Sequence, residues 1–384
     1  MLSVLPRALR ERTVVLNDAP ASRGRYVLYW MHHALRVNEN PALDVARLAA
    51  AELDLPLLVC QGLGGAHPYQ NDRHHFFALQ CARDVANDLA AYGIHYRFHL
   101  DARRHGSVAS LMPDAALTVF EQMPVAPFPK WQASLSARAG SSVLRVDARC
   151  IVPMPLMTKR YDRAFAFRKA AIDLFDARVL SAYPSLDVGL PTGDEDLSVG
   201  ALDVRPLDDG ALLDLVASCP IDHSVAPVFE TVGGSAAGYA RWQAFRNGGL
   251  RSYHQTRNDA AIAPPAGVSR LSPYLHYGCV SPMRVAREAQ QVGGAGAEKF
   301  LDELFVWREL AHNFCAHSPQ LETLDALPAW ASETLRAHAN DPRPAIFSWD
   351  TLAHARTGEP LWDTAQRSLL RHGELHNNVR MTWA

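Results

Sequence analysis

Apolar strand-like runs alternate with amphipathic helical segments over the first 150 residues. Runs rich in aromatic and β-branched residues predict five buried strands, at residues 25–30, 55–60, 94–100, 117–120 and 143–146. Between these runs, apolar residues recur at helical spacing and predict helices at 41–53, at 72–92 and near Trp131. Residues 1–23 are interpreted as a leader to the first strand. Such alternation is typical of an open parallel α/β sheet.

The pattern changes character after residue 150. Residues 151–228 are rich in proline and turn residues, with one helical pattern at 163–180, and we interpret them as an interdomain linker. From about residue 229 only helical patterns remain. They predict helices at 235–249, 273–277, 282–291, 297–315, 328–339, 361–371 and 374–383. We therefore expect an α/β domain over 1–150, a linker with one helix over 151–228, and an all-helical domain over 229–384.

Composition narrows the class of protein. Hydrophobic residues make up 48% of the chain and charged residues 20%, as in ordinary soluble globular proteins. The formal net charge of −2 means that contact with a nucleic acid would need a local basic face. No apolar run is long enough to span a membrane, and arginines interrupt the apolar N-terminus, which argues against a signal peptide. We expect a cytoplasmic protein.

Cysteines and histidines give no metal-binding motif. The six cysteines lack CxxC spacing, so we expect reduced thiols and no zinc site. The pairs His32-His33 and His74-His75 are adjacent in sequence, and neighbours in a helix or strand point to different faces. We therefore expect surface or core histidines there and no bound metal. No GxGxxG follows the first strand, so a Rossmann dinucleotide site is not expected.

A candidate anion site lies at residues 269–272. Ser272 has the residue type of a helix N-cap, and Pro273 would occupy the first helical position. Hydroxyl groups and Arg270 at a helix start suit a phosphate or pyrophosphate. The alternative is an ordinary helix cap that binds no ligand.

Two later helices carry further candidate residues. Glu303 and Trp307 are four residues apart, so they lie on one helical face, where the ring could stack on a planar ligand while the carboxylate accepts an amide N–H. Spacing alone favours a different interpretation, an amphipathic helix with Trp307 in the core. Asn377, Arg380 and Met381 share a face of the last helix, which suits either a bound heteroaromatic ring or phosphate or a plain polar surface.

Taken together, these blocks resemble the DNA photolyase and cryptochrome family, and most closely its class II cyclobutane-dimer photolyases. The matching residues are Tyr253, Arg257-Asn258-Asp259, Ser269-Arg270-Leu271-Ser272-Pro273, Ser281-Pro282, Glu303, Trp307-Arg308-Glu309, Trp362-Asp363, His376-Asn377 and Arg380-Met381. Tyr29-Trp30-Met31 is similar to the family's opening strand. The resemblance covers residues 24–384 and is strongest from 235 onward.

The resemblance implies a helical domain that holds FAD bent into a U. The residues implied to bind the cofactor are Tyr253, Arg257, Val268, Ser269, Arg270, Leu271, Ser272, Arg308 and Arg380. Those implied to act on a pyrimidine dimer extruded from DNA are Glu303, Trp307 and Asn377. The implied reaction is that of a deoxyribodipyrimidine photolyase, a carbon–carbon lyase in which light drives an electron from reduced flavin to the dimer. A protonated Glu303 would then hydrogen-bond a thymine carbonyl.

The resemblance also implies partners and a second pigment. An antenna chromophore, folate or deazaflavin, is expected between the first domain and the helical domain. The expected partner is DNA that contains pyrimidine dimers, and the protein is expected to be a monomer. The arginines available to hold DNA phosphates are Arg241, Arg246, Arg251, Arg284 and Arg287.

Departures from the family pattern leave alternatives open. Val268 stands where a hydroxyl residue is common, so one phosphate contact is lost. The family usually continues well beyond the segment that matches His376 to Trp383. We therefore expect either a truncated product or a flavin pocket that lacks one wall. The alternatives are a cryptochrome-like blue-light photoreceptor and a degenerate family member without repair activity, and six-four photoproducts remain a possible substrate.

Overall fold

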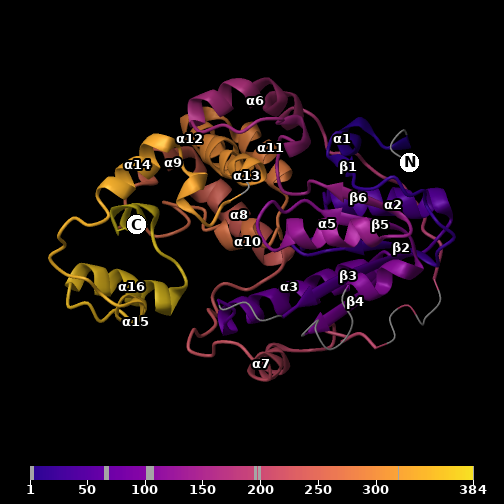
Figure 1. Cartoon of the computed structure of the whole chain (residues 1–384), viewed down its shortest axis with the longest axis horizontal. Coiled ribbons are helices and arrows are strands. Elements are labelled where there is room, and N and C mark those ends of the chain that lie inside the picture. Colours follow the sequence, from indigo (N-terminus) through magenta and orange to yellow (C-terminus); the bar gives the residue numbers. More distant parts are fainter. Residues whose placement is uncertain are drawn as a thin grey trace.

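A six-stranded sheet organises the first part of the chain in the computed structural model, which describes residues 4–64, 69–100, 108–193, 197, 200–318 and 320–383 (Figure 1). The strand order is β1-β6-β5-β2-β3-β4, and the pairs from β6 to β4 are parallel. The strands are β1 (Thr13–Val15), β2 (Tyr26–Trp30), β3 (Leu57–Leu63), β4 (His95–Leu100), β5 (Ala115–Glu121) and β6 (Ser142–Val146). The predicted open parallel sheet is confirmed.

Helices connect the parallel strands. They are α2 (Pro41–Leu53), α3 (Asp72–Ala91), α4 (Val108–Leu111) with η2 (Met112–Asp114), and α5 (Phe128–Arg138), whereas α1 (Arg7–Arg10) precedes β1. Asn40 begins α2, because its side chain accepts hydrogen bonds from the backbone N–H groups of Ala42 and Leu43. The β5 strand is buried throughout, as expected for a central parallel strand covered on both faces.

The N-terminal residues contain structure that the sequence pattern did not predict. Within the segment interpreted as a leader, α1 forms and β1 pairs antiparallel with β6, with Thr13 opposite Val146. A three-residue edge strand is too short to show period-two alternation, and only its partner strand defines it.

The segment predicted as a linker packs closely against its neighbours. It contains η3 (Met154–Leu156), α6 (Ala164–Val179) and α7 (Asp209–Ala217). The predicted helix at 163–180 is confirmed as α6, whereas α7 was not predicted. Leu212 and Val216 of α7 join Phe76 and Leu79 of α3 in one apolar cluster, and Figure 1 shows α7 beside α3.

The rest of the chain is helical, as predicted. Its helices are α8 (Ser235–Gly248), η5 (Leu250–Ser252), α9 (Tyr253–Thr256), α10 (Ser272–His276), α11 (Pro282–Val292), α12 (Gly294–Leu301), the π-helical η6 (Asp302–Trp307), α13 (Arg308–His317), η7 (Leu324–Ala326), α14 (Ala329–Ala337), α15 (Trp349–Ala353), α16 (Pro360–His372) and α17 (Asn377–Trp383). In Figure 1 these orange and yellow helices gather to one side of the sheet. Among the described residues, no helix combines the length and apolar character that a membrane crossing requires.

One hydrophobic core joins the sheet region to the helical region. Phe77 of α3 packs edge-on against Tyr274 of α10, with ring centroids 5.6 Å apart. Buried Arg36 adds a polar link, since its guanidinium donates to the carbonyl oxygens of Gly278 and Ala148, each at 2.8 Å. The two regions are therefore held in a defined relative position by packing and by hydrogen bonds.

Candidate functional site

A cluster of charged and aromatic side chains forms where α9 approaches α12 and η6. Glu303 of η6 accepts from two cations through its Oε1, Arg257 Nη2 at 2.7 Å and Lys299 Nζ at 2.8 Å. The Arg257 guanidinium also lies over the Tyr253 ring, 5.9 Å from its centroid. We call Tyr253, Arg257, Lys299 and Glu303 the helical cluster.

Close backbone packing brings these helices together. A Cβ at Gly296 of α12 would lie 2.1 Å from the carbonyl oxygen of Leu250, so only glycine allows α12 to approach η5 this closely. Phe300 then packs against the Tyr253 ring at a centroid distance of 5.7 Å. Burial raises the pKa of the Tyr253 phenol, so this residue stays a neutral hydrogen-bonding group. The sequence motifs identified Tyr253, Arg257 and Glu303 but missed Lys299, whose only signal is its place one turn before Glu303.

Trp307 lies on the molecular surface. Its side chain is 53% exposed at the end of η6, although Phe300 and Leu304 of the same helical run are buried. The interpretation that spacing alone favoured, with Trp307 in the core, is therefore wrong. The run adopts a π-helix here, and such turns with i→i+5 hydrogen bonds occur often at functional sites. An exposed indole four residues after Glu303 is available to stack on a planar group.

The helix predicted at 273–277 forms as α10 (Ser272–His276), but it lacks the cap that the sequence predicted. The residue before α10 is Leu271, and no side chain caps the helix, whose five residues begin at exposed Ser272. Ser269 Oγ accepts a long 3.4 Å hydrogen bond from Leu271 N, and Leu271 itself is buried. The prediction of Ser272 as an N-cap is wrong, because Leu271 already has helical backbone angles and Ser272 enters the first turn. Val268 and Ser269 are partly exposed beside this turn.

The C-terminal helix docks against the segments that carry the other motifs. Asn378 Nδ2 donates to the carbonyl oxygen of Asn258 at 2.6 Å. Glu374 forms ion pairs with Arg270 and, at 3.6 Å, with Arg241. Within α17, Arg380 Nη2 donates to Asn377 Oδ1 at 2.7 Å. Residues near 257, 270 and 377, far apart in sequence, therefore form one region, and Glu374 is a contact that the sequence did not reveal.

Arg308 points toward the sheet region. Its Nη1 donates to the carbonyl oxygen of Arg149 at 2.7 Å, away from the ion pairs of Glu303. The next residue, Glu309, is fully buried and accepts from the backbone N–H groups of Ile151 and Val152. Burial raises the pKa of the Glu309 carboxyl to about 8. The structure therefore brings Arg308 together with the sheet region and Glu309 with the start of the interdomain segment, and the assignment of Arg308 to the cofactor stays a prediction.

Comparisons with known proteins agree with this arrangement. A family model described as DNA photolyase matches residues 27–164. The chain is 30% identical to a deoxyribodipyrimidine photo-lyase of Methanothermobacter thermautotrophicus, over 97% of this chain and 80% of that protein. It is 31% identical to a deoxyribodipyrimidine photo-lyase of Oryza sativa subsp. japonica, over 97% of this chain and 74% of that protein.

A solved structure supports the same fold. A bacterial class III photolyase from Agrobacterium tumefaciens superposes with a TM-score of 0.69 at 18% sequence identity, over 95% of this chain and 73% of that chain. At this identity the likeness speaks for the fold alone. The sequence identity over nearly the whole chain, joined to the sheet and helical regions described above, shows that this protein belongs to the DNA photolyase family.

Proposed function

We propose that this protein is a light-driven DNA repair enzyme that uses FAD to split cyclobutane pyrimidine dimers. The observation that carries the proposal is the meeting of motif residues from three segments: Tyr253 and Arg257 contact Glu303 and its neighbours, and α17 bonds to Asn258. Membership of the photolyase family supports DNA repair as the general role. The assignment to class II and to the cyclobutane lesion is part of the proposal.

The donor set of this region suits a dinucleotide cofactor. Arg257 and Arg270 supply guanidinium groups, which bind phosphate oxygens in bidentate fashion. Ser269 adds a hydroxyl group, and His376 Nε2 is a buried polar atom without a hydrogen-bond partner in the described part of the chain. We propose that Tyr253, Arg257, residues 268–272 and Arg380 hold FAD. Bound reduced flavin supplies, under light, the electron that opens the cyclobutane ring.

The side chains around this site have distinct proposed roles. The exposed Trp307 indole stacks on the extruded base, a contact worth about 1–3 kcal/mol per base. Arg257 and Lys299 fix the orientation of the Glu303 carboxylate, which accepts a hydrogen bond from a pyrimidine N–H. Asn377 lies in the docked C-terminal helix and offers an amide that both donates and accepts. A damaged pair stacks poorly, so its extrusion costs less than that of an intact pair.

DNA contact and the antenna pigment belong to the same proposal. Four of the five candidate arginines already pair with carboxylates: Arg241 with Glu374, Arg246 and Arg284 with Glu288, and Arg287 with Glu39. Exposed Arg251 is the fifth. We propose that DNA phosphates compete with these carboxylates for the arginines. A folate or deazaflavin antenna between the two regions, and a monomeric state, complete the proposal.

Light-dependent repair of an oligonucleotide with one thymine dimer tests the proposal. We expect flavin absorption in the purified protein and dimer loss only under illumination. Glu303→Ala should lower the repair yield about tenfold, equivalent to about 1.4 kcal/mol, while flavin stays bound. Glu298→Ala, an exposed change on the neighbouring helix α12, is the matched control.

Three results would count against parts of the proposal. A yield unchanged in Glu303→Ala would remove that residue from the repair site. Bound flavin without any repair would favour a photoreceptor. A protein that binds no flavin, even when FAD is added, would indicate a degenerate family member.

A further inference from the structure

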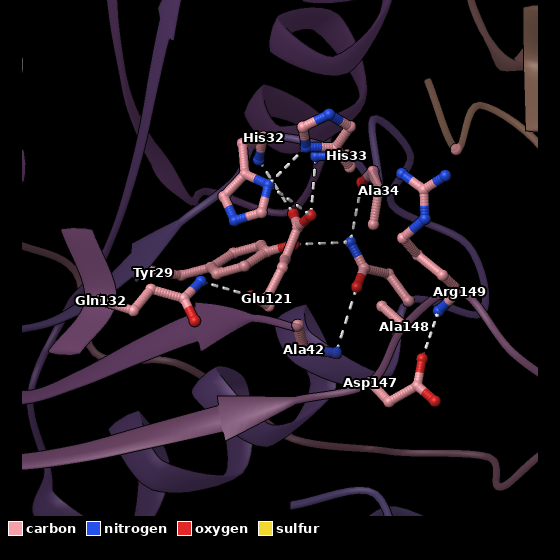
Figure 2. A network of polar contacts seen from close by, with 12 residues as sticks. Tyr29, His32, His33, Ala34, Ala42, Glu121, Gln132, Asp147, Ala148 and Arg149 are labelled. Carbon is pink, nitrogen blue, oxygen red and sulfur yellow. Dashed lines mark hydrogen bonds and ion pairs between the residues drawn. The ribbon is translucent and has the colours of Figure 1, made fainter. Parts of the chain in front are cut away.

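A second polar cluster lies at the carboxyl ends of β2 and β5, on the sheet side of the molecule (Figure 2). It consists of His32, His33 and Glu121, and we call it the strand-end cluster. Chain connections leave β2 and β5 toward opposite sides of the sheet, since β3 and β4 lie beyond β2 and β6 lies beyond β5. Open α/β sheets bind ligands at such a switch point, outside the carboxyl ends of the strands.

The two imidazoles converge, contrary to the sequence expectation. Adjacent residues diverge in a strand, but β2 ends at Trp30 and the chain bends over residues 32–33. The rings of His32 and His33 therefore lie 4.9 Å apart, with their Nδ1 atoms separated by 2.6 Å. His32 Nδ1 is also 3.4 Å from Glu121 Oε2. Figure 2 shows both rings beside the Glu121 carboxylate.

The Glu121 side chain is fully buried beside the two imidazoles. Its exposure is 0%, and among the described residues its ion-pair partner is the His32 imidazole. A buried carboxylate normally requires a cation or a saturated set of hydrogen bonds.

The hydrogen bonds of Glu121 leave one acceptor position open. Oε1 accepts from the Tyr29 hydroxyl at 2.7 Å and from His32 N at 3.0 Å, which fills both of its lone pairs. Oε2 accepts from His33 N at 2.7 Å and retains a second lone pair on the side of His32 Nδ1. In the same cluster, His32 Nε2 is buried and has no hydrogen-bond partner in the described residues.

We propose that His32 Nδ1, His33 Nδ1 and Glu121 Oε2 bind one divalent transition-metal ion of the zinc type. Two imidazoles and a carboxylate form a known zinc ligand set with a fourth position left for water. Ligand atoms on a tetrahedral zinc lie about 3.3 Å apart, given Zn–N bonds of about 2.0–2.1 Å. His32 Nδ1 and Glu121 Oε2, which are 3.4 Å apart, already have this separation. The two Nδ1 atoms, now 2.6 Å apart, would reach it if rotation of the His33 side chain moved its Nδ1 by less than about 1 Å.

Such an ion would tie the end of β2 to the end of β5 and stabilise the face toward the helical region. His33 lies against that region, with its ring centroid 6.3 Å from that of His276. The proposal depends on neither flavin nor DNA binding.

Cobalt provides the direct test, because Co²⁺ in a tetrahedral nitrogen–oxygen site absorbs visible light. The chelator-treated protein should bind one Co²⁺ with this absorption, and Zn²⁺ should displace it. His33→Asn and Glu121→Gln should each weaken binding more than about tenfold. His338→Gln should leave it unchanged, although His338 Nδ1 lies 2.7 Å from Asp341 in an exposed histidine–carboxylate pair.

A second measurement tests the proposal on the wild-type protein, in case the variants do not fold. X-ray absorption of the zinc-loaded wild-type protein should show two imidazoles and oxygen ligands. Fewer than two imidazoles, no binding of either metal, or binding that survives both substitutions would overturn the proposal.

Discussion

The strand-end cluster and the helical cluster each hold a glutamate side chain, but with different kinds of partner. Glu121 is buried and held by neutral donors, whereas Glu303 is partly exposed and held by two cations. Solvent screens the second arrangement, so each of its ion pairs contributes little to stability. In the first arrangement each missing partner leaves a desolvated group, which costs about 1–3 kcal/mol. Burial therefore decides how much each partner contributes: a lost partner costs stability in the strand-end cluster and little in the helical cluster.

The largest expected effect comes from the backbone that supports the strand-end cluster. Gly278 has a φ of +70°, and a Cβ there would lie 2.0 Å from the carbonyl oxygen of His33. Gly278→Ala should therefore lower the free energy of unfolding by about 3 kcal/mol or more, measured by urea denaturation. Gly294→Ala is the control, because Gly294 also has a positive φ but a Cβ there would meet no atom within 4 Å. Equal losses in both variants would show that the contact with His33 is not tight.

Buried Glu309, six residues after Glu303, is expected to make the stability of the fold depend on pH. Burial raises the pKa of Glu309 to about 8, above its ordinary value near 4.5. As pH rises between these values, the unfolded chain releases the proton and the folded chain keeps it, so stability falls until about pH 8. We expect a loss of about 3 kcal/mol between pH 5 and pH 8, measured by urea denaturation.

Glu309→Gln should remove this pH dependence, since the amide does not ionise. Glu322→Gln, at an exposed position, should retain it. If the profile of Glu309→Gln ran parallel to that of the wild type, the carboxyl would not carry the effect.

The smallest effect is expected in the helical cluster. Lys299→Met removes one of the two cations on Glu303 and should change stability by less than about 1 kcal/mol, an effect that high salt should erase. Thermal denaturation at low and high ionic strength measures it, with exposed Lys169→Met as the control for loss of a lysine. A larger and salt-independent loss would mean that this ion pair is effectively buried.

Much of the fold followed from local patterns. The α2 helix begins and ends at the predicted residues, 41 and 53, because Asn40, Pro41 and the apolar spacing act within a few residues of one another. The β1 strand and α7 were missed because each depends on packing against a distant partner, β6 for the strand and α3 for the helix. Periodicity cannot show such partners when an element is short.

The candidate site divides in the same way. Motif order identified Tyr253, Arg257, Glu303 and Asn377, since these residue types recur in a recognisable sequence. Spacing placed Trp307 in the core, although its side chain is exposed. The exposure of a side chain depends on what packs against the helix, and helical spacing does not show this. The contacts of Lys299 and Glu374 likewise appear only once the helices are assembled.

The amino-acid sequence by itself determined the order of strands and helices, the family and the residues of its motifs. Only the tertiary structure decided which charges are buried and which partners they meet. His33 and Glu121 are 88 residues apart, and they meet because β2 and β5 are neighbours in the sheet. Hydrophobic periodicity reports the burial of a residue within its own element, whereas the environment of a charge depends on the elements that surround it.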